Sequence, residues 1–472
     1  MSSYTQNLPQ EDPKRWKALM LLGFANFIVI MDSAIIQVAL PAIKNSLDYS
    51  EANLQWVMNA FLLLFGGLLL LGGKLSDLFG QRRIFALGVV ILTIASLFAG
   101  LAWNELSLNI ARGIQGVGSA FIAPAALSII MRLFNGNKEE MGKALAVWGL
   151  SGAAGGSIGI VLGGVITQLF GWRWTLLIYV PFGLTILFLS FRLLKKGERT
   201  KGSIDYVGAI SVTVSLMLIV FGIINAEQNG WQDLSTIMTL IIGAILFITF
   251  IIVQARRKEP LMPLSIFKTP NLSAGNISLI LLAASWFPLV YFLILYLQQV
   301  LKFEPFTAAM GMLPAPILLA IFMITLAEKV MNKLGLKFTT VLGFVILGIA
   351  GLLLSGNTVD GTYWRDVLFA ILLAALGNAL AYLPSTTAAV SEASNEQSGL
   401  ASGLYNTSYQ IGSAIGLAIM VSIAAAFTAS KTSGSEEYIL NIGYQQAFFW
   451  CAMVAFLGAI LSLVLTRSLN KK

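Results

Sequence analysis

The chain has 472 residues, of which 57% are hydrophobic and only 11% are charged, and its mean hydropathy is +0.82. These values lie outside the range of soluble domains and predict an all-α polytopic membrane protein. The net charge of +8 is spread along the chain, which argues against nucleic-acid binding, and the lack of histidine removes the commonest metal ligand and proton shuttle. We therefore expect no cofactor and no metal, and any proton carrier within the membrane must be a carboxylate.

Apolar runs long enough to cross a bilayer core of about 30 Å recur along the whole chain. We predict fourteen spans, near 17–42, 53–73, 84–102, 106–134, 141–169, 174–194, 205–225, 234–254, 271–299, 306–329, 338–355, 365–385, 400–428 and 446–466. The polar first 15 residues do not resemble a cleavable signal peptide, so the first span is expected to remain as an anchor.

The basic residues predict the orientation of these spans. With the N-terminus in the cytoplasm, 24 of the 30 lysines and arginines fall in cytoplasmic segments, five fall outside, and Arg112 lies within a span. Positively charged loops favour the cytoplasm. Because the number of spans is even, both termini are predicted to be cytoplasmic.

The first span, FANFIVIMDSAIIQVALPAI (24–43), carries an aspartate, Asp32, among apolar residues. A carboxylate at this depth costs about 2.5 to 3.5 kcal/mol and is usually functional. At about 100° per residue, Asn26, Ser33 and Gln37 lie within roughly 140° of Asp32. This polar side is predicted to face a cavity.

The turn after the second span reads GKLSDLFGQRR (73–83), and EKVMNKLGLK (328–337) echoes it in the second half. Internal repeats are common in secondary transporters. The echo predicts two six-helix bundles, 1–200 and 259–472, with two additional helices between them in 201–258. The turn is interpreted either as a latch between conformations or as a simple topology anchor, formed by Gly73, Asp77, Gly80, Arg82 and Arg83.

The fourth span contains LNIARGIQGVGSA (108–120), where Arg112 is the other charge clearly at mid-depth. Gln115 and its polar neighbours form a stripe beside Arg112. We predict that Arg112 pairs with Asp32, and that a change in cavity hydration switches the carboxyl group between its charged and protonated forms. The alternative is a static buried pair.

The fifth span contains GLSGAAGGSIGIVLGG (149–164), whose glycines recur in a 3-4-3-4 spacing. Small residues let helices approach closely in lipid. This bare face either allows one bundle to move against the other or simply packs tightly. The glycines concerned are Gly149, Gly152, Gly156, Gly159 and Gly163, with Gly164 following directly.

Aromatic and amide side chains recur in the spans of the second half. Such groups suit planar or cationic lipophilic molecules through stacking and cation–π contacts, although aromatics also serve helix packing. The candidates for a substrate cavity are Asn26, Ser33, Gln37, Gln115, Trp286, Tyr291, Asn378, Tyr382, Tyr405, Asn406 and Tyr409.

No nucleotide-binding P-loop is present, because the nearest segment, LLLLGGKL (68–75), lacks the first glycine and the final hydroxyl. The motifs MDSAIIQVALPAI, GKLSDLFGQRR and LNIARGIQGVGSA resemble those of the major facilitator superfamily, specifically its fourteen-helix drug:proton antiporter family of the EmrB/QacA type. GWRWTLLIYVPFG, EPLMPLSIF and LYLQQVL resemble further landmarks of that family. Two features depart from it: Ile160 replaces a proline in the fifth span, and no second mid-depth acid occurs in the second half.

The resemblance implies a proton-coupled multidrug efflux antiporter that works by alternating access in a bacterial plasma membrane and confers antibiotic resistance. Asp32 would take up the proton and Arg112 would set its affinity. The expected partners are small-molecule drugs or lipophilic solutes, protons and membrane lipids, and the chain is expected to act as a monomer. The alternatives are an exporter of a specific endogenous solute, such as a lipid-like acid, peptide or metabolite, and a non-transporting membrane sensor. No enzymatic motif is evident, so an enzyme is not expected.

Overall fold

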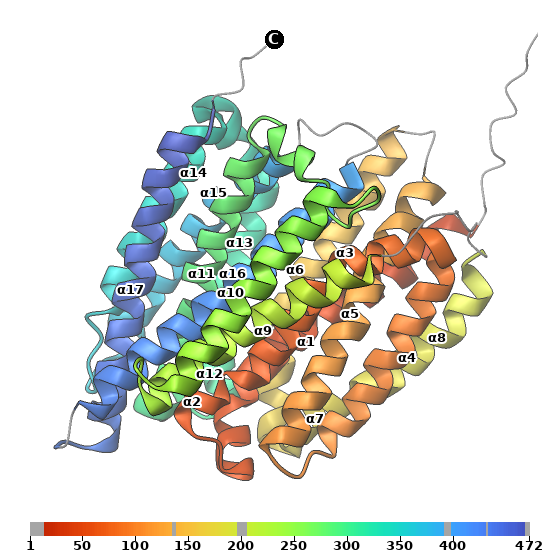
Figure 1. Ribbon diagram of the computed structural model, residues 1–472. Coiled ribbons are helices and arrows are strands. Elements are labelled where there is room, and N and C mark those ends of the chain that lie inside the picture. Colours follow the sequence, from red (N-terminus) through yellow and green to blue (C-terminus); the bar gives the residue numbers. More distant parts are fainter. Residues whose placement is uncertain (1–13, 135–137, 196–204, 391–397, 431–432, 468–472) are drawn as a thin grey trace, which may run out of the picture.

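The protein is described here from a computed structural model that covers residues 14–134, 138–195, 205–390, 398–430 and 433–467. Within these ranges it is almost entirely helical, with no β-strand, and fourteen helical segments are long and apolar enough to cross a membrane. The predicted number of spans is confirmed. The start of the first long helix (red) and the end of the last one (dark blue) both lie toward the top of Figure 1; we call this the terminal end and the opposite one the distal end.

The helices of the first half are α1 (Arg15–Leu47), α2 (Glu51–Leu54), α3 (Trp56–Phe79), α4 (Gln81–Gly100), α5 (Glu105–Leu133), α6 (Lys138–Phe170), α7 (Arg173–Leu177) and α8 (Tyr179–Leu193). Short helices precede two of the long ones, so that α2 with α3 and α7 with α8 each form one span. α6 runs through Ile160 without a break, as expected where no proline interrupts the helix.

Two helices follow the first half, α9 (Tyr206–Asn229) and α10 (Leu234–Arg256), and a 3₁₀ turn, η1 (Leu264–Lys268), leads on from them. The second half contains α11 (Leu272–Leu295), the π-helical turn η2 (Tyr296–Val300), α12 (Pro305–Met312), α13 (Pro314–Thr325), α14 (Ala327–Leu354), the π-helical turn η3 (Tyr363–Leu368), α15 (Phe369–Val390), α16 (Ser398–Ala429) and α17 (Glu436–Leu465).

The two echoed turns share an unusual backbone conformation. Gly80, between α3 and α4, has φ +95°, and Gly335, within α14, has φ +79°. Residues with a Cβ rarely adopt such angles, so glycine permits the chain to reverse there. α14 is therefore a short segment followed by a long helix, which accounts for the predicted start of a span near residue 338.

Packing follows the two halves of the chain. In the first half α1 packs on α6, and α5 packs on both α3 and α4; in the second, α14 packs on α15 and α17, and α11 packs on α16. The division into residues 1–200, 201–258 and 259–472 stays a prediction, and its first boundary lies outside the described residues.

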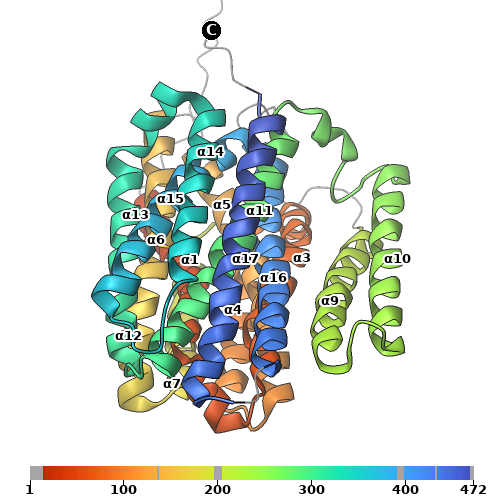
Figure 2. The ribbon, with the colours of Figure 1, turned by 90° about the vertical axis from the view of Figure 1, so that its left-hand side faces the viewer.

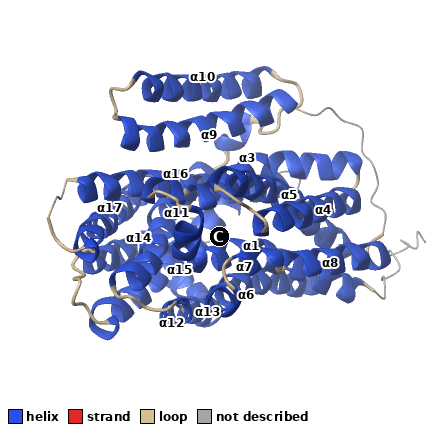
Figure 3. Ribbon diagram, turned by 90° about the horizontal axis from the view of Figure 1, so that it is seen from below, coloured by secondary structure: helices blue, strands red, loops and turns tan. Residues whose placement is uncertain are grey.

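α9 and α10 form a separate layer along one side of the molecule (Figures 2 and 3). α9 contacts both α3 and α16. The Ser422 hydroxyl of α16 donates to the Ile223 carbonyl of α9 over 3.3 Å, and the rings of Trp56 and Phe221 lie 6.2 Å apart. α10 lies outside α9 and exposes many large apolar side chains, as suits a helix that faces lipid. α9 thus covers one side of the line where the two halves meet.

Candidate functional site: a buried ion pair between α1 and α5

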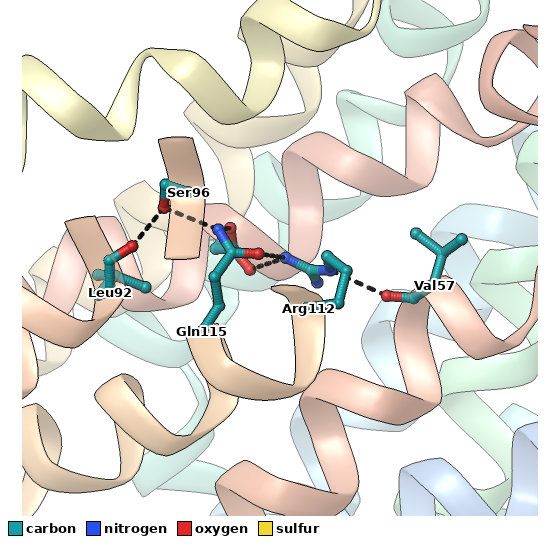
Figure 4. A network of polar contacts seen from close by, with 6 residues as sticks. Val57, Leu92, Ser96, Arg112 and Gln115 are labelled. Carbon is teal, nitrogen blue, oxygen red and sulfur yellow. Dashed lines mark hydrogen bonds and ion pairs between the residues drawn. The ribbon is translucent and has the colours of Figure 1, made fainter. Parts of the chain in front are cut away.

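Asp32 of α1 and Arg112 of α5 form an ion pair in the interior of the first half, and both side chains are fully buried. The Arg112 Nε also donates to the Val57 carbonyl of α3 over 2.9 Å (Figure 4). Its guanidinium lies 4.7 Å from the centre of the Phe61 ring. Two neighbouring helices, α1 and α3, therefore hold the arginine of α5, and the predicted pairing of Asp32 with Arg112 is observed.

Gln115 extends this network towards α4. Its Oε1 accepts from Nη1 of Arg112 over 2.9 Å, and its Nε2 donates to the Ser96 hydroxyl over 2.8 Å (Figure 4). The same Nε2 lies 3.4 Å from Oδ1 of Asp32. Gln115 is fully buried, and its side chain orients the ion pair. Its place in a substrate cavity stays a prediction.

Some buried polar atoms near the pair have no hydrogen-bond partner among the described residues. They include Nη2 of Arg112 and the phenol oxygen of Tyr179. Tyr179 begins α8 and lies close enough to Asp32 and Arg112 to interact electrostatically with both. Tyr179 was not predicted as a site residue, because a tyrosine within an apolar span is ordinary.

The other candidates on α1 differ in exposure. Nδ2 of Asn26 donates to the Trp148 carbonyl and to the Ser151 hydroxyl of α6, each over 3.1 Å, so Asn26 mainly joins two helices. Gln37 is buried, whereas Ser33 is half-buried. Of these predicted cavity residues, Ser33 therefore keeps the most accessible surface.

The glycines of α6 serve two different surfaces. Gly152, Gly159 and Gly163 face α1 within the first half, whereas Gly164 meets α12 of the second half. Cβ atoms added at Gly149 and Gly156 would meet nothing within 4 Å. These two positions lie on α6 between the face that packs on α1 and the one that packs on α12. The predicted bare face is therefore not one continuous interface, and open space borders α6 at these two positions.

We expect Gly164→Val to reduce export at least about tenfold. An added Cβ would come within 2.6 Å of the Ala309 Cβ and within 2.9 Å of the Phe306 Cα. The two halves could therefore not close at the distal end. Interiors tolerate such overlaps poorly. The rate of substrate efflux from energised cells measures the effect. Gly142→Val is the matched control, since nothing lies within 4 Å there; equal rates in the two variants would contradict the expectation.

The aromatic candidates of the second half lie on α11, α15 and α16. The rings of Tyr382 and Tyr409 meet edge to face, with centroids 5.7 Å apart. These two tyrosines are half-buried, as are Trp286, Tyr405 and Asn406, and the role of all five in a substrate cavity stays a prediction. Tyr291 and Asn378 are buried, with 1% and 6% of their surfaces exposed, and their place in a substrate cavity stays a prediction.

We expect Tyr409→Leu to raise KM for a planar substrate roughly tenfold while Tyr409→Phe changes it little. An aromatic contact contributes about 0.5–1.5 kcal/mol beyond its buried area, and about 1.4 kcal/mol corresponds to a factor of ten. Initial rates of transport against substrate concentration provide the test. An equal rise in KM in both variants would show that the aromatic ring is not the group that contacts the substrate.

The residues of the echoed turn lie at the terminal end. Nη1 of Arg82 donates to the Leu194 carbonyl over 3.0 Å, and its guanidinium lies 5.0 Å from the centre of the Phe191 ring. Arg82 thus stabilises the last turn of α8. Asp77 and Arg83 are exposed. A Cβ at Gly73 would lie 3.8 Å from Pro124. The proposed latch function of these residues stays a prediction.

Fourteen helical spans, two echoed turns and a buried ion pair are features of a polytopic membrane protein with two related halves. Residues 22–417 match the sequence profile of the Major Facilitator Superfamily. The chain belongs to this superfamily, as its motifs predicted, and is therefore a multi-pass membrane transporter and not an enzyme.

The chain is also similar to individual proteins. The cephamycin export protein CmcT of Amycolatopsis lactamdurans is 33% identical over 79% of this chain and 78% of its own. The puromycin resistance protein pur8 of Streptomyces alboniger is 33% identical over 80% of this chain and 76% of its own. A bacterial homologue of the human lysosomal transporter Spinster, solved in an inward-facing conformation, has the same fold, with a TM-score of 0.70, 16% identity, and coverage of 96% of this chain and 97% of that one.

Proposed function

We propose that the protein exports lipophilic small molecules, cationic or planar, in exchange for protons by alternating access. The observation that carries this proposal is the buried Asp32, which pairs with Arg112 in a chain without histidine. A membrane-buried acid is costly and usually marks an ion or proton site. Relatives named for cephamycin export and puromycin resistance support small molecules as substrates.

In this scheme the terminal end faces the cytoplasm of a bacterial cell, and the chain acts as a monomer. Asp32 takes up a proton from outside, and the protonated form favours return to the inward-facing state. Changes in substrate binding or hydration on the cytoplasmic side then release the proton. Arg112 competes with the proton for the carboxylate and so sets its affinity.

The energy available is adequate for export. One charge moving through 100 mV yields about 2.3 kcal/mol, so an assumed ~150 mV yields roughly 3.5 kcal/mol. Because about 1.4 kcal/mol corresponds to a tenfold ratio, one net charge supports a gradient of a few hundredfold. A single titrating carboxyl group is therefore sufficient.

A second candidate is an exporter of one specific solute, and the relatives favour it in one respect, since each is named for a single antibiotic. Competition separates the two functions. Transport of a lipophilic cationic dye is measured in everted vesicles while unrelated neutral and cationic drugs are added in turn. Inhibition by several unlike compounds supports the multidrug function, whereas a vesicle preparation that transports none of them favours a specific solute.

A further inference from the structure

The π-helical turn η2 is fixed firmly to its own half of the protein. The Tyr296 hydroxyl donates to the Thr358 carbonyl over 2.8 Å, and the Tyr444 hydroxyl donates to Oε1 of Gln299. Just beyond the turn, Nζ of Lys302 lies 2.9 Å from the carboxylate of Glu437. π-Helical turns within α-helices often occur at functional sites. This one is joined to the second half by these contacts at the distal end.

Gln298, in the middle of the turn, contacts the other half. Its Nε2 donates to the Val38 carbonyl of α1 over 3.0 Å. Pro41 lies within α1 just beyond this point, and because proline has no N–H, the Gln37 carbonyl loses its helical donor. Side chains of neighbouring helices commonly satisfy carbonyl groups exposed at such a proline. Gln298 thus binds α1 at the carbonyl next to the one that Pro41 leaves without its helical donor.

The hydrogen bond from Gln298 to Val38 borders a polar cavity of about 190 Å³ at the distal end. Pro41 and Lys44 of α1 line it on one side, and Gln298, Gln299 and Glu436 of the second half line it on the other. The two halves therefore meet across this cavity, and separating them there would break the bond between Gln298 and Val38.

α1 connects this contact to the ion pair. Val38 lies six residues beyond Asp32 on the same helix, a rise of about 9 Å. A displacement of α1 that accompanies proton uptake at Asp32 would therefore reach the Val38 carbonyl directly. A second bond joins the halves at this end, from the Phe306 backbone N–H to Oε1 of Gln168 over 3.1 Å.

We propose that Gln298 is a latch that holds the distal end closed and ties that closure to α1, the helix that carries Asp32. The inference rests on the proposed function, because it assigns to Gln298 a positioning role in alternating access. Its neighbour Gln299 lines the same cavity but bonds to Tyr444 within its own half. The two glutamines therefore form a matched pair for testing.

Distances between spin labels at the distal end test the latch. Cys451, the single cysteine, is buried and is replaced by alanine. Labels are attached at Trp103→Cys in the first half and Trp364→Cys in the second, because both tryptophans are well exposed. Gln298→Leu and Gln299→Leu are compared with the parent protein at a pH where the parent shows both short and long distances.

We expect Gln298→Leu to raise the ratio of long to short distances about threefold to tenfold, the usual effect of one lost hydrogen bond. Gln299→Leu is expected to change the ratio less than about twofold, because the bond from Tyr296 to the Thr358 carbonyl still anchors η2. An unchanged ratio in Gln298→Leu, or the same shift in both variants, would overturn the latch. If Gln298→Leu does not fold, Gln298→Glu removes the amide donor at nearly constant size and is expected to shift the ratio in the same direction.

The latch and the proposed function can fail separately. The distances require neither substrate nor a pH gradient. If the distance ratio changes only in Gln298→Leu and the protein shows no proton-coupled transport, the latch is supported and proton exchange is rejected. If the protein shows proton-coupled transport but Gln298→Leu leaves the distance ratio unchanged, proton exchange is supported and the latch is rejected.

Discussion

Asp32→Asn is expected to lower pH-gradient-driven export at least about tenfold. Asparagine keeps the shape of the side chain but cannot exchange a proton near neutral pH. The chain contains no histidine that could take over this function, and Asp32 is fully buried against Arg112. Efflux of a preloaded lipophilic cationic dye from energised cells measures the loss.

Asp48→Asn is the matched control for this variant. Asp48 follows the same helix at its distal end, is exposed, and has φ +56°, a backbone conformation that asparagine also tolerates. We expect its efflux to equal that of the parent protein at similar expression. If Asp32→Asn still extrudes dye at the parent rate, the proton site lies elsewhere.

Arg112→Leu is expected to destabilise the protein by about 3–5 kcal/mol, because it leaves the buried Asp32 carboxylate without its partner. Replacing both partners removes the uncompensated charge. The double variant Asp32→Leu with Arg112→Leu should therefore recover most of the stability. Unfolding in detergent, monitored as the free energy of unfolding or as Tm, measures all three proteins.

The double variant also separates the two interpretations of the ion pair. If the pair is a static structural contact, a stable double variant should export substrate normally. If Asp32 carries the proton, the double variant should be stable and inactive. A single Arg112→Leu variant as stable as the parent would contradict the buried charge pair itself.

The sequence was sufficient for those features that depend on local chemistry. The number of spans follows from the lengths of the apolar runs. The fourteen spans of the structure confirm the predicted number. The pairing of Asp32 with Arg112 was predictable because few charges occur at mid-depth and a buried charge requires a partner. The turns at Gly80 and Gly335 were likewise visible as an echo.

Features that depend on the rotation and packing of helices were not predictable. Gln115 and Gly149 belong to clear sequence patterns, but the packing of neighbouring helices decides whether such residues meet a cavity, a partner or open space. Tyr179 and Gln298 were missed for another reason. Tyr179 is an ordinary residue for an apolar span, and Gln298 stood only within the landmark LYLQQVL, without a role. The significance of each arises from a distant segment that it approaches, the Asp32–Arg112 pair for Tyr179 and the Val38 carbonyl for Gln298.

Proton movement in liposomes that contain the purified protein tests the central claim most directly. A pH-sensitive dye is enclosed, a pH gradient is imposed, and a lipophilic cationic substrate is added to the parent protein and to Asp32→Asn in parallel. The account predicts that substrate accelerates the collapse of the gradient with the parent protein and not with Asp32→Asn. Substrate transport without any proton movement in the parent protein would contradict proton exchange.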